Sequence, residues 1–234
     1  MLPADASAGT SAADGLLRAS LGVTAALALV LLLALGWLLL GGRSGPRKAS
    51  AQAVSAGAGV LLGVLLVVDL ILVAGSRRAT RTAIPTGPDV VRVELLAQQF
   101  SFNLRHPGTD GVFNTDDDVV ELDVLRVPVG RPVAIQGRSK DVVHGAYFPH
   151  FRAQVETVPG RTTRAWFRPG AVGRYDFLCT QLCGPAHYQM RGEVVVMTPD
   201  DFARYIDRAS DAARRAATLT PLPPERRWGW SWTP

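Results

Sequence analysis

Residues Tyr175–Val196 read YDFLCTQLCGPAHYQMRGEVVV and hold both cysteines of this 234-residue chain. The two ends of the stretch are rich in aromatic and β-branched residues, so Arg174–Leu178 and Gly192–Val196 are predicted to be strands. The loop between them carries four side chains with soft or borderline donor atoms: Cys179, Cys183, His187 and Met190. Two thiolates, an imidazole and a thioether suit copper rather than magnesium or calcium.

The second cysteine is the informative one, because a single-copper electron-transfer site uses only one. Two cysteines four residues apart can instead bridge two copper ions, which then need ligands from elsewhere in the chain. His144, in the segment SKDVVHGAYFP, is the first candidate, since that segment could pair with the strand that leads into the loop. His150 competes with it, whereas His106 lies in a turn-like HPG and is expected at the surface. A disulfide or a zinc site are the alternatives, but neither accounts for Met190.

Outward from this loop, the C-terminal half of the chain consists of short β-type segments separated by Gly, Pro and Asp. The further predicted strands are Val90–Phe102, Val119–Val127, Pro132–Gln136 and Ala165–Phe167. About ten residues per strand, without helices between them, predicts an antiparallel sandwich or barrel. One helix follows over 199–216, with Thr198 as its cap, and residues 217–234 form a tail rich in Pro and Trp.

The N-terminal part is far more apolar. After a tail over residues 1–18, the run 19–42 has no charged residue, and its 24 residues correspond to roughly 36 Å of helix, enough to cross a bilayer core. A second apolar run, 49–76, is interrupted only by Asp69. We therefore expect two transmembrane helices joined by the loop 43–48. Basic residues lie both in this loop and after the second run, so the charge pattern leaves the orientation open.

Composition excludes some classes of function. Basic residues number 25 and acidic residues 20, and the arginines are spread along the chain, so no polybasic nucleic-acid surface is predicted. Two cysteines are too few for a disulfide framework or a four-thiolate zinc site.

Taken together, these segments resemble subunit II of the haem–copper cytochrome c oxidases, which carries the dinuclear copper A centre. The resemblance covers the helical hairpin, RVELLAQQFSFNLRHPG, VPVGRPVAIQGRSKDVVHGAYFPHF, the cysteine loop and the helix that starts TPDDF. It implies a two-helix membrane hairpin followed by an all-β, cupredoxin-like Greek-key sandwich over 82–198. It also implies a bacterial cytoplasmic membrane, with the copper domain on the outer, periplasmic side.

The resemblance also implies roles for individual residues. Cys179 and Cys183 would bridge two copper ions, His144 and Met190 would complete one of them, and His187 with the main-chain oxygen of Gln181 would complete the other. The chain would take electrons from a cytochrome c or a similar donor and pass them to haem in subunit I, where oxygen is reduced. The haem and the oxygen-reducing site would belong to that partner. A membrane-tethered copper-storage protein without electron transfer is the alternative.

Three positions depart from the family pattern or invite another interpretation. Phe100 stands where many relatives have the tryptophan that first accepts the electron. Gln181 replaces a common glutamate, so we expect the magnesium ion at the interface with subunit I to be bound weakly or not at all. The acidic segment Asp110–Asp118 is expected to be a solvated turn, with calcium binding as the alternative.

Overall fold

The computed structural model describes residues 4–7, 11–41, 51–80, 84–219 and 222–223 of the chain. Two compact units are present: a helical unit, Ser11–Ala83, and a β-rich unit that combines Met1–Thr10 with Ile84–Pro234. The predicted loop over 43–48 and most of the predicted C-terminal tail lie outside the described residues.

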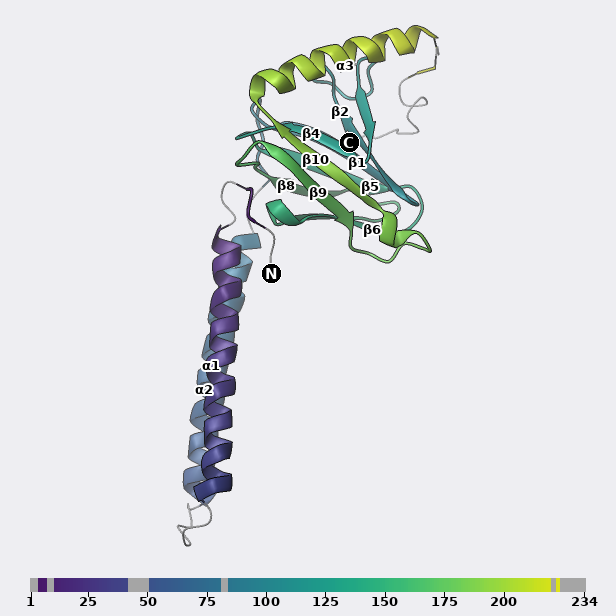
Figure 1. Ribbon diagram of the computed structural model, residues 1–234. Coiled ribbons are helices and arrows are strands. Elements are labelled where there is room, and N and C mark those ends of the chain that lie inside the picture. Colours follow the sequence, from purple (N-terminus) through teal and green to yellow (C-terminus); the bar gives the residue numbers. More distant parts are fainter. Residues whose placement is uncertain (1–3, 8–10, 42–50, 81–83, 220–221, 224–234) are drawn as a thin grey trace. The chain divides into compact units, whose positions relative to one another are not determined.

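The helical unit consists of α1 (Ser11–Gly41) and α2 (Ala51–Thr80), which run beside each other (Figure 1). They approach closely at Gly75, where an added Cβ would lie 2.8 Å from Leu16 Cδ2. Among the described residues, Asp14–Leu33 is long and apolar enough to cross a membrane, with a mean hydropathy of 2.2. This confirms one membrane-length apolar helix. The described apolar part of α2, Gly63–Gly75, is shorter, so its crossing stays a prediction.

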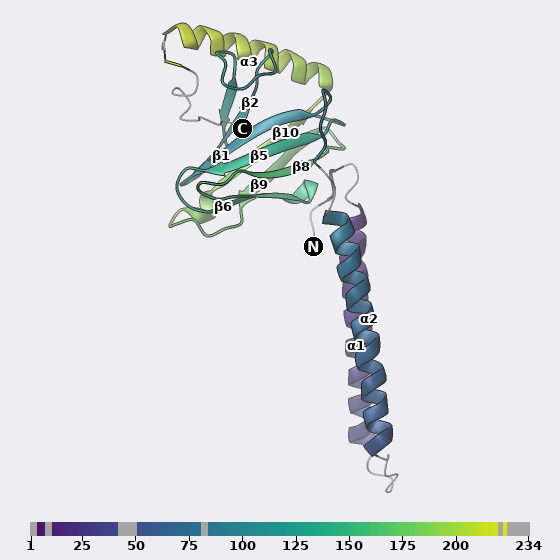
Figure 2. The ribbon, with the colours of Figure 1, turned by 180° about the vertical axis from the view of Figure 1, so that it is seen from behind.

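The β-rich unit contains two five-stranded sheets, as the predicted sandwich requires (Figures 1 and 2). One sheet has the order β3-β2-β1-β5-β8 and the other the order β4-β10-β9-β6-β7. The strands of the first sheet are β1 (Val91–Gln98), β2 (Ser101–His106), β3 (Val119–Leu122), β5 (Val133–Ser139) and β8 (Thr163–Phe167). Those of the second are β4 (Val124–Pro128), β6 (His144–Phe148), β7 (Ala153–Thr157), β9 (Gly173–Cys179) and β10 (Arg191–Met197).

The core lies between these sheets because apolar side chains alternate inward along the strands. It includes a series of packed aromatic rings: the Phe148 and Phe177 rings are stacked with centroids 5.1 Å apart, and Phe151 and Phe167 with centroids 4.5 Å apart. Aromatic burial of this kind supplies much of the apolar area that stabilises a sandwich.

Two of the predicted strands were too long. Val90–Phe102 is in fact β1 and the start of β2, which turn back on each other at Gln99 and Phe100. Val119–Val127 is split at Asp123, which has a positive φ of 58° and takes the chain from the first sheet to the second. Asp123 stabilises that crossing. Its main-chain nitrogen donates to the Phe102 oxygen on β2, and its side-chain Oδ1 accepts from the Phe102 nitrogen. Its main-chain oxygen accepts from the Glu193 nitrogen on β10.

The expected antiparallel pairing was wrong for two pairs. β1 pairs with β5, and β4 pairs with β10, in parallel. In each case the chain crosses to the other sheet between the two strands, and it returns running in the same direction as the first strand. The sequence prediction also missed β6 and β7, although it placed His144 on a segment facing the strand that leads into the cysteine loop. That expectation is confirmed, because β6 pairs with β9.

The C-terminal helix α3 (Pro199–Leu219) begins at the predicted cap, where the Asp201 main-chain nitrogen donates to Thr198 Oγ1 at 3.2 Å. It lies across the end of the sandwich that carries β3 and β4 (Figure 1). It ends three residues later than predicted, because Ala217 is still buried against the domain. Phe202 begins its apolar face and contacts the His106 ring at a centroid distance of 5.8 Å.

Beside α3, a buried ion cluster links three parts of the first sheet. Arg105 on β2 is fully buried and is paired with Glu94 on β1 and with Asp118 before β3. Burial raises the pKa of Asp118 to about 6 and also raises the pKa of Glu94, and in both cases the charge of Arg105 offsets only part of that cost. Removal of the Arg105 side chain would leave the carboxyl groups of Glu94 and Asp118 buried without their shared positive charge.

We therefore expect Arg105→Ala to destabilise the domain strongly, by about 3–5 kcal/mol, since breaking a buried pair leaves uncompensated charge. Arg131→Ala is the matched control, because its partner Asp89 is 78% exposed, and exposed pairs contribute less than about 1 kcal/mol. Urea unfolding of the purified protein in detergent, followed by near-ultraviolet circular dichroism, measures both. Equal stability losses would contradict a special role for Arg105.

Candidate metal centre

The cysteine loop is held closed at its base. Cys179 is the last residue of β9 and Met190 immediately precedes β10, and the Cys179 main-chain nitrogen donates to the Met190 oxygen at 3.0 Å. Within the loop, a short 3-10 helix over His187–Gln189 turns the chain, with the His187 nitrogen donating to the Gly184 oxygen at 3.0 Å. These main-chain bonds fold the loop so that its donor side chains meet.

The sulfur atoms lie together in the interior. Cys179, Cys183 and Met190 are at most 5% exposed. The Sγ atoms of Cys179 and Cys183 are 3.9 Å apart, and Met190 Sδ is 3.6 Å from Cys183 Sγ. His187 Nδ1 is also 3.6 Å from Cys183 Sγ. The structure thus brings together all four predicted donors of the loop.

His144 joins this group from β6. Its side chain is fully buried, and its ligand atom and those of the two cysteines lie within 4.8 Å of one another. No other group of histidine, cysteine and carboxylate side chains in the described part of the chain comes together in this way. His144 Nε2 contacts Asp141 Oδ1 at 2.8 Å, while its buried Nδ1 has no partner among the described residues.

Backbone pairing explains how His144 reaches the cysteines. Ala146 on β6 lies directly opposite Cys179 on β9, and the Thr180 nitrogen donates to the Gly145 oxygen at 2.9 Å. Gly145 allows this approach, because an added Cβ would lie 2.5 Å from Thr180 Oγ1. Since side chains alternate along a strand, His144 and Ala146 are on the same face, which is the face of Cys179.

The other two histidines lie elsewhere. His150, the competitor of His144, packs with its ring tilted against that of Tyr175, at a centroid distance of 5.2 Å. Its Nδ1 contacts the main-chain oxygen of Ala4 at 3.0 Å. The expectation that His106 lies at the surface was wrong: it is 2% exposed, at the end of β2. Burial, with the charge of Arg126, lowers the pKa of His106 to about 4, so it is neutral near pH 7.

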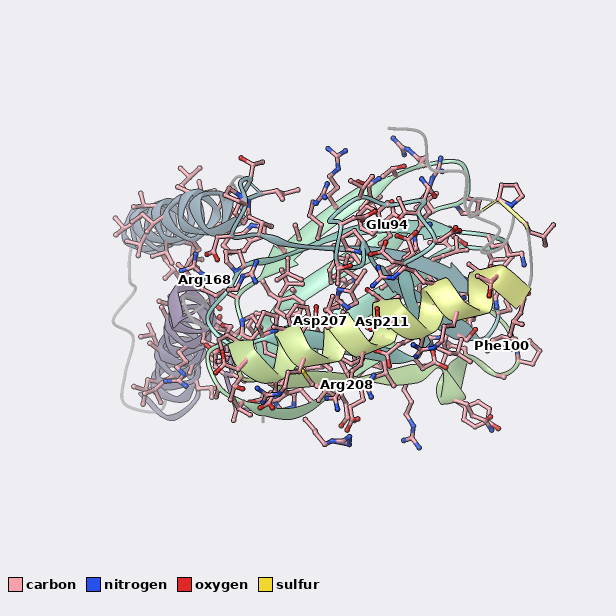
Figure 3. All side chains as sticks on the ribbon, turned by 90° about the horizontal axis from the view of Figure 1, so that it is seen from above. Glu94, Phe100, Arg168, Asp207, Arg208 and Asp211 are labelled. Carbon is pink, nitrogen blue, oxygen red and sulfur yellow. The ribbon has the colours of Figure 1, made fainter. Side chains whose placement is uncertain are left out.

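Gln181 and Phe100 border the sulfur atoms. The Gln181 main-chain oxygen is 3.2 Å from Cys179 Sγ, while its side chain is exposed. Phe100 is half-buried at the edge of the domain (Figure 3), and its ring packs against Gly184, where an added Cβ would lie 3.0 Å from Phe100 Cε1. Both predicted residues therefore lie beside Cys183 or Cys179.

Two supporting residues were missed by the sequence analysis. Asp141 holds His144, and its Oδ2 accepts a hydrogen bond from the Gln99 main-chain nitrogen at 2.7 Å. The Gln99 side chain in turn donates to the Cys183 oxygen at 2.6 Å. Burial opposes ionisation of Asp141, but the hydrogen bonds from His144, Gln99 and Val142 outweigh it and lower its pKa. The spacing of Asp141 three residues before His144 was the available signal.

The donor set fits a soft metal ion. Burial, and then the neighbouring Cys179, raises the pKa of Cys183 to about 11, so without a metal this thiol keeps its proton at pH 7. Metal binding must release protons here, as it does at thiolate sites generally. The unpartnered Nδ1 of His144 and the clustered sulfur atoms are complementary to a copper ion rather than to a hard cation.

The acidic segment Asp110–Asp118 has a different role. Asp117 accepts hydrogen bonds from Thr109, Asp110 and Thr115 and pairs with Arg214 at 3.0 Å. Asp118 is occupied by Arg105 and by the Asn114 nitrogen. Because protein donors engage both carboxylates, this geometry supports a structural turn rather than a calcium site. The expected solvation was wrong for its last two residues, since Asp117 and Asp118 are 3% and 1% exposed.

Comparison with known proteins agrees with this geometry. Residues 103–198 match the family described as the periplasmic domain of cytochrome c oxidase subunit II. The chain is 37% identical to the alternative cytochrome c oxidase subunit 2 of Bradyrhizobium diazoefficiens, over 51% of each chain. It is 33% identical to cytochrome c oxidase subunit 2 of Thermostichus vulcanus, over 57% of this chain and 37% of that one.

Among solved structures, the periplasmic domain of subunit II of cytochrome oxidase from Bradyrhizobium japonicum superposes with a TM-score of 0.49 at 19% identity. That match covers 56% of this chain and 99% of the other. The chain spans about half, or less, of the length of the two curated relatives named above. With a β-sandwich, a buried Cys–Cys–His cluster and these relatives, the β-rich part of the chain is similar to cytochrome c oxidase subunit II.

Proposed function

We propose that this chain is the subunit through which electrons enter a terminal cytochrome c oxidase. It receives them from a cytochrome c or a similar small redox protein and passes them to haem in subunit I, where oxygen is reduced. The observation that carries the proposal is the pair of buried thiols 3.9 Å apart, surrounded by donors from His144, His187 and Met190. The haem and the oxygen-reducing site belong to the partner subunit.

The donor set supports two copper ions, as in a copper A centre. Cys179 and Cys183 would hold both ions, His144 and Met190 would hold one of them, and His187 with the Gln181 main-chain oxygen would hold the other. Bound copper would supply one-electron redox chemistry. This arrangement favours electron transfer over copper storage, which needs exchangeable ligands rather than buried donors held by strands and hydrogen bonds.

Asp141 prepares His144 for this role. A histidine that donates Nε2–H to a carboxylate has its lone pair on Nδ1, and the buried Nδ1 of His144 is the atom without a partner. Such carboxylates orient the ring and raise its basicity as a metal ligand. Asp141 is thus a positioning residue for one copper ion. Gln181, with a neutral side chain, supplies only its main-chain oxygen and offers no charge to magnesium.

The N-terminal segment supports a two-pass topology in a bacterial cytoplasmic membrane. Its residue Ala6 donates to the His150 oxygen at 2.9 Å and accepts from the Gly170 nitrogen at 2.7 Å, so residues before α1 pack on the copper domain. This contact supports a topology in which the chain before α1 and the chain after α2 lie on the same side of the bilayer. We therefore propose that the chain crosses with α1 and returns with α2, with the copper domain on the periplasmic side.

The full chain, purified in detergent and loaded with copper, is expected to bind two ions and to show one unpaired electron delocalised over both. Cys179→Ser or Cys183→Ser should abolish this signal, whereas Met190→Leu should keep both ions and change the potential, since a thioether is a weak ligand. His144→Ala should lose bound copper, whereas His150→Ala, its control, should keep both ions. One copper per chain with a four-line paramagnetic resonance spectrum would support the storage alternative.

Asp141→Asn is expected to lower copper affinity by about 10–100-fold, because His144 loses the carboxylate that orients its ring. Asp176→Asn, an exposed change on β9, is the matched control and should leave the affinity unchanged. Competition with a copper chelator measures both affinities. If the two variants bind copper equally well, Asp141 has no positioning role.

Topology is tested by cysteine labelling, since the native cysteines are buried and react slowly. With a membrane-impermeant reagent on intact cells, Thr86→Cys should be labelled and Ser44→Cys should not. Permeabilised cells provide the control, because both positions should then react. Labelling of Ser44→Cys from outside would overturn the proposed orientation.

A further inference from the structure

One stretch of the β-rich unit, away from the metal donors, carries positive charge only. Residues 157–175 contain four arginines and no aspartate or glutamate. The stretch includes β8, which is an edge strand of the first sheet, and the loop that leads from β8 to β9. Arg168, just after β8, and Phe100, beside the metal donors, lie at opposite ends of the β-rich unit (Figure 3). The basic stretch is therefore separate from the candidate metal centre.

The alternation of side chains along β8 places a tryptophan beside two of these arginines. Phe167 is 3% exposed and stacks on Phe151 in the core, so Arg164 and Trp166 lie on the opposite, outer face of the strand. Arg164 and Arg168 are exposed, and Trp166 is half-buried. Within the part of the chain that the structure describes, neither arginine forms an ion pair with a carboxylate. Both positive charges are thus available to another molecule.

The loop after β8 adds an exposed apolar side chain. It reads RPGAVGR over 168–174, and Val172, just before β9, is 56% exposed. The loop is held in place at its main chain, since Tyr175 Oη donates to the Ala171 oxygen at 3.1 Å. Basic and apolar groups therefore project together from this end of the domain. We call the group the β8 surface, and its members are Arg164, Trp166, Arg168 and Val172.

The N-terminal segment links the β8 surface to the apolar helix α1. Ser7 forms an antiparallel bridge with Pro169, and the Gly170 nitrogen donates to the Ala6 oxygen at 2.7 Å. Four Cα steps of about 3.8 Å lead from Ser7 to Ser11, where α1 begins, so this part of the chain reaches at most about 15 Å. α1 contains the apolar segment of membrane length. Chain connectivity therefore limits how far the β8 surface can lie from the start of that helix.

The side chains of the β8 surface match the interface of a lipid bilayer. Tryptophan prefers the headgroup level, because its ring is apolar while its N–H binds polar groups. Arginine forms paired hydrogen bonds to phosphate and is attracted to anionic headgroups. An exposed valine beside them adds apolar area that a bilayer can bury. An acidic protein would attract the arginines as well, but the short link to α1 favours the bilayer, since it limits the distance between the two.

We propose that the β8 surface binds the anionic lipid headgroups of the membrane that α1 crosses. Arg164 and Arg168 bind headgroup phosphates, Trp166 lies at the headgroup level, and Val172 contacts the outer part of the acyl region. This second point of attachment restricts rotation of the β-rich unit about its connections to the helices, and so orients the metal centre against the bilayer. The inference rests on the proposed membrane anchoring and involves no metal ligand.

The test uses the full chain in nanodiscs of phosphatidylcholine, either alone or mixed with phosphatidylglycerol. Val172→Cys carries a fluorophore that nitroxide groups on the lipid heads quench on contact, and the native thiols are buried and do not compete for the label. Thr162→Cys, exposed at the other end of β8, is the control position. We expect position 172 to be quenched more strongly in the anionic discs, and position 162 in neither. High salt should weaken the quenching, because ions screen the headgroup charge.

Removal of the two arginines should weaken the contact. In the labelled Val172→Cys chain, Arg164→Gln/Arg168→Gln is expected to lower the ratio of lipid-contacting to free states by about fivefold for each arginine, given the attraction of a basic side chain to an anionic surface. Arg161→Gln is the matched control, because Arg161 is exposed before the start of β8, and the ratio should stay unchanged. Copper content should be the same in all variants, which separates lipid contact from metal binding.

Equal quenching of position 172 in the two kinds of disc would overturn the inference, as would undiminished quenching in the double arginine variant. So would protection of position 172 only when the other oxidase subunits are present, because the β8 surface would then be a protein interface. In each of these cases, a chain that still co-purifies with the discs leaves the membrane anchoring standing. A chain that does not enter the discs would instead defeat the anchoring itself.

Discussion

The pairing of β6 with β9 is the constraint on which the candidate site depends. It sets Ala146 opposite Cys179, and the alternation of side chains then puts His144 on the same buried face as both cysteines. A shift of the pairing by one residue would turn His144 to the other face of the sheet. The main-chain bond from Thr180 to Gly145 extends the pairing by one step and makes such a shift costly.

Hydrogen bonds complete the positioning of the donor side chains that the strand pairing begins. The loop is closed at its base by the bond from Cys179 to Met190, and Gln99 joins it to the turn between β1 and β2. Asp141 connects the same turn to His144. The donors are thus held near one another by groups that do not themselves bind metal. Donors held in this way suit the electron transfer proposed for the site, which requires that the ligands move little.

The sandwich also separates two kinds of chemistry. Near α3, the charged groups are buried or paired, as in the cluster of Arg105, Glu94 and Asp118. At the metal loops, the interior is occupied by sulfur and imidazole, and the exterior by leucine, tyrosine and amides. The first arrangement stabilises the fold through buried ion pairs, whereas the second leaves the surface beside the metal donors free for contact with a partner.

The donor types and most of the elements follow from the sequence alone. The spacing of Cys179, Cys183, His187 and Met190 predicts a soft-metal loop, and the structure brings these side chains together. The cap at Thr198 identified the start of α3. Both depend on residues close together in the chain, where local geometry follows from local sequence. The same local patterns overestimated the strands 90–102 and 119–127, since alternation continues through the turn at Gln99 and through the crossing at Asp123.

Which distant groups meet depends on the tertiary structure. It selected His144 over His150, buried His106, and gave Asp141 and Gln99 their supporting positions. It also made two strand pairs parallel, because the chain changes sheets at Asp123. These outcomes rest on strand register and on hydrogen bonds between residues as far apart as Gln99 and Cys183. Residue types and their spacing carry no record of such contacts, which form only when the two sheets close on one core.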